Sequence, residues 1–133
     1  MDDETYEVSE PVEIPDGKHE AEITEVELNL HGEYEYIDIY FCLTDVEGAI
    51  LKYGVPAPKQ GKLGSFSKLG TLLSLSGFEI KNGVSISLSG IIKHLIGQKA
   101  EFKTVNVPKD INGQKYEFAE IVEGTISFLQ KKL

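Results

Sequence analysis

The chain has 133 residues, a formal net charge of −9 and a single cysteine, Cys42. This length predicts one domain with one core, and the lone cysteine excludes an internal disulfide and a zinc site built from cysteines. No apolar run approaches the roughly 18 residues that a membrane-spanning helix requires, and the acidic start is unlike a secretory signal, so we expect a cytoplasmic protein.

Charge is distributed unevenly along the chain. Residues 1–50 contain sixteen carboxylates and one lysine, Lys18, whereas residues 51–133 contain twelve lysines and six carboxylates. The formal charges of these two parts are therefore −15 and +6. Every cation is a lysine, which is a mobile point charge and lacks the planar fork of arginine. This pattern favours loose, sequence-tolerant binding of an anion.

The first sixteen residues carry seven of the carboxylates and no cation. Pro11 and Pro15 interrupt any regular structure there. We therefore predict a flexible acidic arm over residues 1–16 and a single domain over residues 17–133. An arm that serves only solubility is the alternative interpretation.

Three alternating segments follow, at 18–30, 34–45 and 49–58, and predict a meander of three strands. A bulge is expected at Glu25-Val26 in the long first strand. In the second strand, Ile37, Ile39, Phe41 and Leu43 share one face, and Tyr34, Tyr36, Asp38, Tyr40 and Cys42 share the other.

Helical periodicity appears next, in two short segments. Residues 65–77 predict an amphipathic helix with Ser65 at its start and Gly77 at its end, and Phe66 on its apolar face. Residues 89–97 predict a second helical segment, capped by Ser89 and ended by Gly97.

The chain then returns to strands at 98–108 and 114–129, joined through the turn signal Asn112-Gly113. Five strands with a helix between strands three and four predict a mainly β fold, the Greek-key barrel called the OB-fold. A small α+β domain with an open sheet is the alternative.

Signatures of an enzyme are missing from this pattern. There is no phosphate-binding glycine loop, no His-Glu-x-x-His and no Gly-x-Ser-x-Gly, and the three histidines are scattered. We therefore expect a protein without catalytic activity, metal site or cofactor.

The tyrosine face points to single-stranded nucleic acid, because bases stack on aromatic rings at about 1–3 kcal/mol each without regard to sequence. Lysines near this face and in the last hairpin would follow the phosphates. The predicted binding residues are Tyr34, Tyr36, Tyr40, Lys52, Tyr53, Lys59, Lys62, Lys109 and Lys115. Further rings, Phe102, Tyr116 and Phe118, fit the core equally well.

Two observations favour other interpretations. Tyrosines in neighbouring strands stabilise a sheet without any ligand. In addition, Glu33, Glu35 and Asp38 lie among the tyrosines and would repel phosphate. A protein-interaction or structural module, such as a component of a virion or a replisome, is the alternative function.

Four runs of residues carry a resemblance to a known family. These are PDGKHEAEITEVEL, FSKLGTLLSLSGF, LIGQKAEFKTVNV and NGQKYEFAEIVE. The chain resembles, over about residues 15–128, the small single-stranded DNA-binding OB-fold proteins of phages, other viruses and some prokaryotes. In such proteins a G-x-[YH]-x-A-x-I strand opens the barrel and an L-x-G-[KQ]-K turn precedes the fourth strand.

The resemblance implies binding of single-stranded DNA in replication or recombination, in the host cytoplasm if the protein is viral. The matching positions are Tyr34, Tyr36, Tyr40, Lys52, Tyr53, Lys109 and Lys115. RNA as the ligand, a protein partner docked by the acidic arm, and a homo-oligomer remain alternatives. The end of the chain, Gln130 to Leu133, departs from the acidic tail of bacterial relatives, and the chain has no arginine or tryptophan.

Overall fold

The computed structural model describes residues 12–59, 62–64, 66–81 and 83–129, and shows a mainly β fold with two helices. The strands are β1 (Gly17–His31), β2 (Tyr34–Leu43), β3 (Ile50–Pro56), β4 (Lys99–Ile111), β5 (Gln114–Ile121) and β6 (Ser127–Leu129). The helices are α1 (Lys68–Leu75) and α2 (Leu88–Leu95), both between β3 and β4.

The first three strands form the predicted meander. β1 pairs antiparallel with β2, and β2 with β3, so the sheet begins in the order β3-β2-β1. The register of β1 shifts between Ile23 and Glu25, slightly before the expected bulge. Because of this shift, Ala21, Ile23 and Val26 are all buried although their spacing is not strictly two.

The sheet continues through β4, which pairs with both β1 and β5. The predicted last strand at 114–129 is in fact two strands, β5 and β6, and β6 pairs with the other end of β4. A turn at 122–126 interrupts it, where Gly124 has a φ of 80° that strands do not allow. The expectation of five strands was therefore wrong, and the antiparallel sheet has six.

The first helix begins later than the sequence predicted, and the second begins earlier. The N-cap of α1 is Ser67, whose Oγ accepts the Gly70 N–H at 3.0 Å, and Phe66 precedes the helix with 99% of its surface exposed. The predicted cap Ser65 lies outside the described residues. The N-cap of α2 is Ser87, not Ser89, because the Ser87 Oγ accepts the Gly90 N–H at 3.0 Å.

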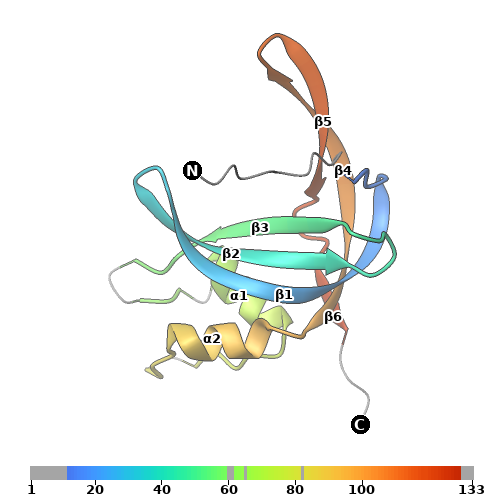
Figure 1. The fold of residues 1–133 in the computed structure, drawn as a ribbon. Coiled ribbons are helices and arrows are strands. Elements are labelled where there is room, and N and C mark those ends of the chain that lie inside the picture. Colours follow the sequence, from blue (N-terminus) through green and yellow to red (C-terminus); the bar gives the residue numbers. More distant parts are fainter. Residues whose placement is uncertain (1–11, 60–61, 65, 82, 130–133) are drawn as a thin grey trace, which may run out of the picture.

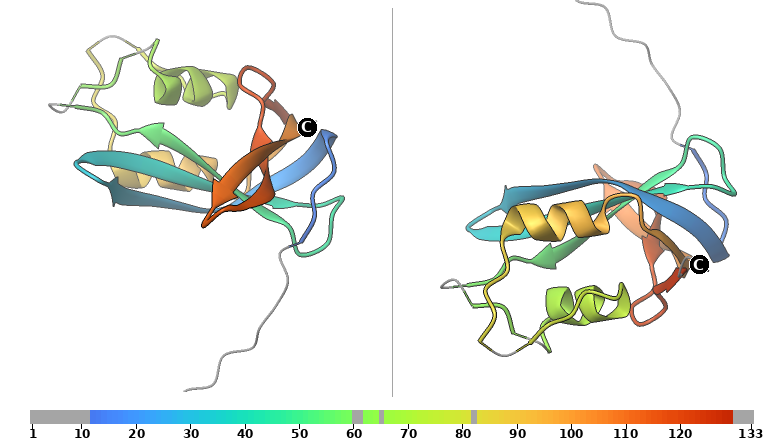
Figure 2. Two further views of the ribbon diagram at one scale, coloured as in Figure 1. Left: turned by 90° about the horizontal axis from the view of Figure 1, so that it is seen from above. Right: turned by 90° about the horizontal axis from the view of Figure 1, so that it is seen from below.

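The curved sheet and the two helices enclose one core. In Figure 1 the helices lie below the strands, whereas the β1–β2 and β4–β5 hairpins rise on either side of β3. In the view from below in Figure 2, α2 lies across β1 and β2, whereas α1 lies to one side of them. At the centre, Phe41 and Phe102 meet edge to face with ring centres 5.2 Å apart. Within the described residues no ladder of hydrogen bonds joins β3 to β5, so the sheet is open there.

Part of the predicted acidic arm packs on the sheet. Residues 1–11 lie outside the described residues. Ile14 is buried in the core, and the side chain of Asp16 accepts hydrogen bonds from Asn106. The packed structure therefore starts before Gly17.

Across the ranges that the structure describes, neither helix is long and apolar enough to cross a membrane.

Candidate nucleic-acid interface

The three tyrosines of β2 lie on one face of the sheet, as the alternation predicts. The aliphatic side chains of β2 are buried on the other face. Tyr34 is exposed, and Tyr36 and Tyr40 are half-buried. We call the side of β1, β2 and β3 that carries these rings the tyrosine face.

A groove of about 470 Å³ opens at the Tyr34 end of the tyrosine face, between residues 33–36 and residues 56–59. The Lys59 Nζ lies 5.4 Å from the centre of the Tyr34 ring, within the range of a cation–π contact. The Ala57 N–H donates to the Glu35 carbonyl at 3.0 Å and holds the segment after β3 against the hairpin. This groove therefore presents an exposed ring and a cation side by side.

The middle of the tyrosine face is occupied by a buried carboxylate, Asp38, of which 1% is exposed. Its Oδ2 accepts hydrogen bonds from Asn29 Nδ2 and His31 Nε2, both at 2.8 Å. Burial raises the pKa of Asp38, but these bonds and the positive charge of Lys52 outweigh burial, so the pKa lies below its usual value. Asp38 is a fixed negative charge beneath the polar surface. Its Oδ1 has no hydrogen-bond partner among the described residues.

Carboxylates also surround Tyr40. Glu25 lies opposite Tyr40 in the β1–β2 register, and the Tyr40 hydroxyl donates to Glu27 Oε2 at 3.4 Å. Burial and the neighbouring carboxylates raise the pKa of Tyr40. A hydrogen bond to Glu27 raises the pKa of Glu25, since the two carboxyl groups compete for one proton. This part of the face is negatively charged and would repel phosphate.

Tyr53 is not brought together with the other tyrosines. It lies opposite Ile39 in the β2–β3 register and therefore points to the core side of the sheet. Its hydroxyl donates to Glu123 Oε2 at 2.9 Å, and Lys68 Nζ donates to the other oxygen of Glu123, also at 2.9 Å. Burial and the bond to Glu123 raise the pKa of Tyr53 to about 12. Strand alternation after Lys52 could have indicated this separation.

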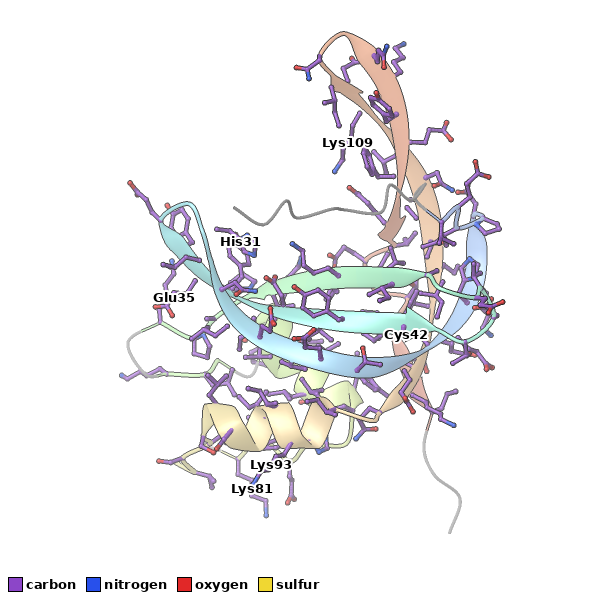
Figure 3. The ribbon with its side chains drawn as sticks, viewed as in Figure 1. His31, Glu35, Cys42, Lys81, Lys93 and Lys109 are labelled. Carbon is purple, nitrogen blue, oxygen red and sulfur yellow. The ribbon has the colours of Figure 1, made fainter. Side chains whose placement is uncertain are left out.

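The β4–β5 hairpin carries a second group of exposed rings. Tyr116 and Phe118 are 45% and 41% exposed, and their ring centres lie 6.5 Å apart. Lys109 Nζ lies 5.6 Å from the centre of the Phe118 ring and 3.2 Å from Glu120. By contrast, Phe102 is buried in the core. Figure 3 shows Lys109 on this hairpin and His31 near the other hairpin.

A pocket of about 740 Å³ lies between this hairpin, the strand β3 and the segment 12–15. Its lining includes exposed apolar side chains that the sequence analysis did not single out: Val12, Ile50 and Ile111. They come from three segments far apart in the chain, so no local pattern indicates them.

The remaining predicted lysines are exposed at different places. Lys52 lies opposite Tyr40 on the tyrosine face. Lys62 forms a small bridge with Lys59 in the segment that follows β3. Lys115 lies opposite Asp110 near the tip of the β4–β5 hairpin. Two groups thus emerge, one at each hairpin, with the acidic middle of the tyrosine face as a separate surface.

In the part of the chain that the structure describes, no three histidine, cysteine, aspartate or glutamate side chains are grouped so that they could hold a metal ion. The sequence matches no model of a known protein family and none of the curated proteins.

Proposed function

We propose that this chain is a non-enzymatic OB-fold protein that binds single-stranded DNA with little sequence preference, in replication or recombination. The strand pairing supports the fold assignment. A meander β1-β2-β3, helices between β3 and β4, and pairing of β4 with both β1 and β5 are the connections expected of this partly open barrel.

One observation carries the proposed function: an exposed ring with a lysine beside it occurs at each of the two hairpins. These pairs are Tyr34 with Lys59 and Phe118 with Lys109. An aromatic ring can stack a base of any sequence, and the adjacent ammonium can contact a phosphate. The hairpins rise on either side of β3, so a single strand can be held at both (Figure 1).

Between the two ends, Tyr36 and Tyr40 would contact bases, while Lys52 would offset part of the charge of Asp38. Lys62 and Lys115 extend the lysine groups at the two hairpins. The acidic middle of the face limits phosphate contacts there, which favours modest affinity. The lysines at the two ends make the binding depend on salt.

The test is a fluorescence titration of labelled oligo-dT with wild-type protein and the variants Tyr34→Ala and Phe118→Ala, at two salt concentrations. Each variant is expected to lose about 1–3 kcal/mol of binding free energy, the usual contribution of one stacked base. Tyr53→Phe is the matched control, because it removes only a hydroxyl on the other side of the sheet. Wild-type affinity in both alanine variants would exclude these rings as stacking platforms.

A protein-interaction module is the second candidate, and the carboxylates around Tyr40 favour it. Glu25, Glu27 and Asp38 create a negative surface that suits a basic protein better than a polyanion. Failure to bind any single-stranded oligonucleotide at low salt, together with a stable oligomer in sedimentation, would support this function over DNA binding.

A further inference from the structure

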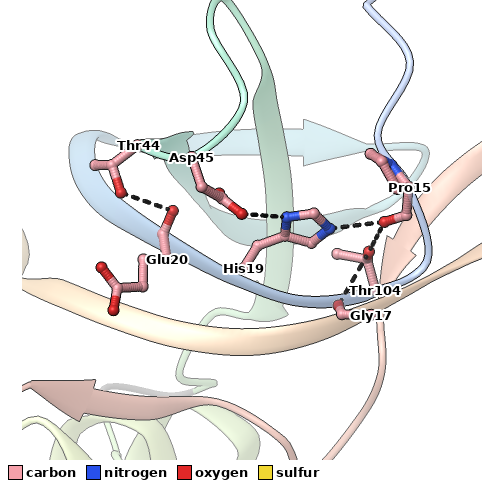
Figure 4. Close-up of polar contacts among 7 residues, drawn as sticks. All are labelled: Pro15, Gly17, His19, Glu20, Thr44, Asp45 and Thr104. Carbon is pink, nitrogen blue, oxygen red and sulfur yellow. Dashed lines mark hydrogen bonds and ion pairs between the residues drawn. The ribbon is translucent and has the colours of Figure 1, made fainter.

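His19 is buried on the core side of β1, with 6% of its surface exposed, and both of its ring nitrogens contact oxygen atoms (Figure 4). Nδ1 lies 2.7 Å from Oδ2 of Asp45, in the loop after β2. Nε2 lies 2.7 Å from the carbonyl oxygen of Pro15, in the segment before β1. The imidazole therefore joins two segments that are not neighbours in the sequence.

The two contacts require a protonated ring. A neutral imidazole has one N–H, so in either tautomer the other nitrogen would direct its lone pair at an oxygen 2.7 Å away. A carbonyl oxygen and an ionised carboxylate can only accept. The imidazolium donates to both.

The charges around His19 favour this form. Asp45 is the charged group that faces the ring. From β4, the facing groups are neutral: Phe102 lies opposite His19 in the register, and the Thr104 hydroxyl donates to the same Pro15 carbonyl at 2.9 Å. The neighbouring charges Lys18 and Glu101 pair with each other at 3.2 Å.

Burial lowers the pKa of His19, but the hydrogen bonds to Pro15 and Asp45 and the negative charge of Asp45 outweigh burial and raise it above its ordinary value. Because the pKa of His19 is higher in the folded protein than in the unfolded chain, protonation of the ring stabilises the fold. This stabilisation is fully present below the ordinary histidine pKa of about 6.5 and is lost as the pH rises through the pKa of the folded state.

The segment held by His19 borders the pocket at the β4–β5 hairpin. Its residues Val12 to Pro15 line that pocket together with Phe118 and Tyr116. Besides the contact between His19 and Pro15, the segment is held by burial of Ile14 and by the Thr104 hydroxyl on the Pro15 carbonyl. Asn106 also donates to the Ile14 carbonyl at 2.8 Å and to the Asp16 carboxylate at 2.7 Å. Among these contacts, the hydrogen bond from His19 is the one made by a group that titrates near neutral pH, so it is the contact that a rise in pH weakens.

We propose that His19 is a pH-sensitive clasp, whose imidazolium fixes residues 12–16 against β1 and β4 and whose deprotonation loosens this segment from the sheet. The clasp works with or without nucleic acid. Because residues 12–15 form one wall of the pocket at the β4–β5 hairpin, the order of this wall changes with pH. The change occurs at a higher pH than the titration of an ordinary histidine.

The test is an NMR titration of the full-length, isotope-labelled protein from about pH 5 to about pH 9, a range that spans histidine titration. The three histidine rings are observed directly, and His19→Gln assigns the relevant signal. We expect the His19 midpoint to lie above the ordinary value. The heteronuclear NOE values of the Glu13, Ile14 and Asp16 amides, which report fast backbone motion, should fall relative to those of the β1–β2 ladder, with the same midpoint.

Asp45→Asn provides the second variant, because it removes the carboxylate from an exposed loop and leaves the ring in place. It should lower the His19 proton affinity at least threefold and move the loosening of the segment to lower pH by the same amount. His94→Gln is the matched control and should change neither. A His19 midpoint at or below the ordinary value, or heteronuclear NOE values of Glu13, Ile14 and Asp16 that do not change through the midpoint, would overturn the proposal.

Discussion

Asp38 is a buried carboxylate on the tyrosine face, and its position depends on a glycine in the neighbouring strand. Its carboxylate is buried beneath Asn29 and His31, and Gly54 on β3 leaves the space that it occupies. A Cβ at Gly54 would lie 2.9 Å from Asp38 Oδ1, closer than van der Waals contact allows. The glycine is needed here for close approach.

The variant Gly54→Ala tests this packing. The added methyl group must displace a carboxylate that two hydrogen bonds hold in place, so we expect a loss of about 1–3 kcal/mol in the free energy of unfolding. Urea denaturation measures it. Gly64→Ala is the matched control, since its nearest contact would be an ordinary 3.9 Å, and it should be as stable as the wild type or slightly more stable. Equal stability of the two variants would show that Asp38 moves freely.

At the same scale, sequence reasoning placed Tyr34, Tyr36 and Tyr40 correctly on one face, because strand alternation is local. It could not show that Asp38, on that same face, is buried, since burial depends on side chains from β1. Nor could sequence reasoning predict that His19 contacts two connecting segments. Its partners Pro15 and Asp45 are brought to it by the packing of two connecting segments, for which the sequence has no periodic signal.

Among the elements, the starts of the helices were the least predictable feature. Serines occur at 65, 67, 87 and 89, and each could accept a hydrogen bond from a helix N-terminus. Packing of Leu69, Leu72 and Leu73 into the core sets where α1 runs, and this selects Ser67. The Asn112-Gly113 turn was predictable, because its φ angles of 51° and 81° are those that only such residues adopt readily.

The choice of cap can be measured. Ser67→Ala removes the acceptor of the Gly70 N–H and should destabilise the protein by about 0.5–2 kcal/mol in urea unfolding. Ser74→Ala, at an exposed position inside the same helix, is the control and should have little effect or stabilise slightly. If the two variants unfold at the same urea concentration, Ser67 does not act as the cap.

At the scale of the whole molecule, carboxylates and lysines that are separated along the sequence also lie on different surfaces of the fold. Acid gathers around the middle of the tyrosine face, and lysines stand at the two hairpins beside exposed rings. The sequence predicted both kinds of residue. Their separation depends on how β4 and β5 cross the end of β1, which composition does not reveal.

This arrangement predicts which lysines contribute to salt dependence. Lys59→Ala and Lys109→Ala should each reduce the magnitude of the slope of log affinity for oligo-dT against log salt by about one, the change expected for one phosphate contact. The reduction should be smaller for Lys109→Ala, because Glu120 already pairs with Lys109. Lys93→Ala, on the helix side in Figure 3, is the control and should leave the slope unchanged. The same slope in all three variants would mean that the lysines act only through overall charge.

The strand β1 has a consequence for how the protein folds. Its later part pairs with β2 across a two-residue turn, whereas its beginning pairs with β4, and there Gly17 meets Thr104 at a separation of 87 positions. Closing so long a loop costs more chain entropy than closing a hairpin, and folding slows as contacts become more distant in sequence. We therefore expect the meander to form early and the β1–β4 ladder late, so that β4 and β5, with Lys109 and Lys115, join the acidic strands in the last steps of folding.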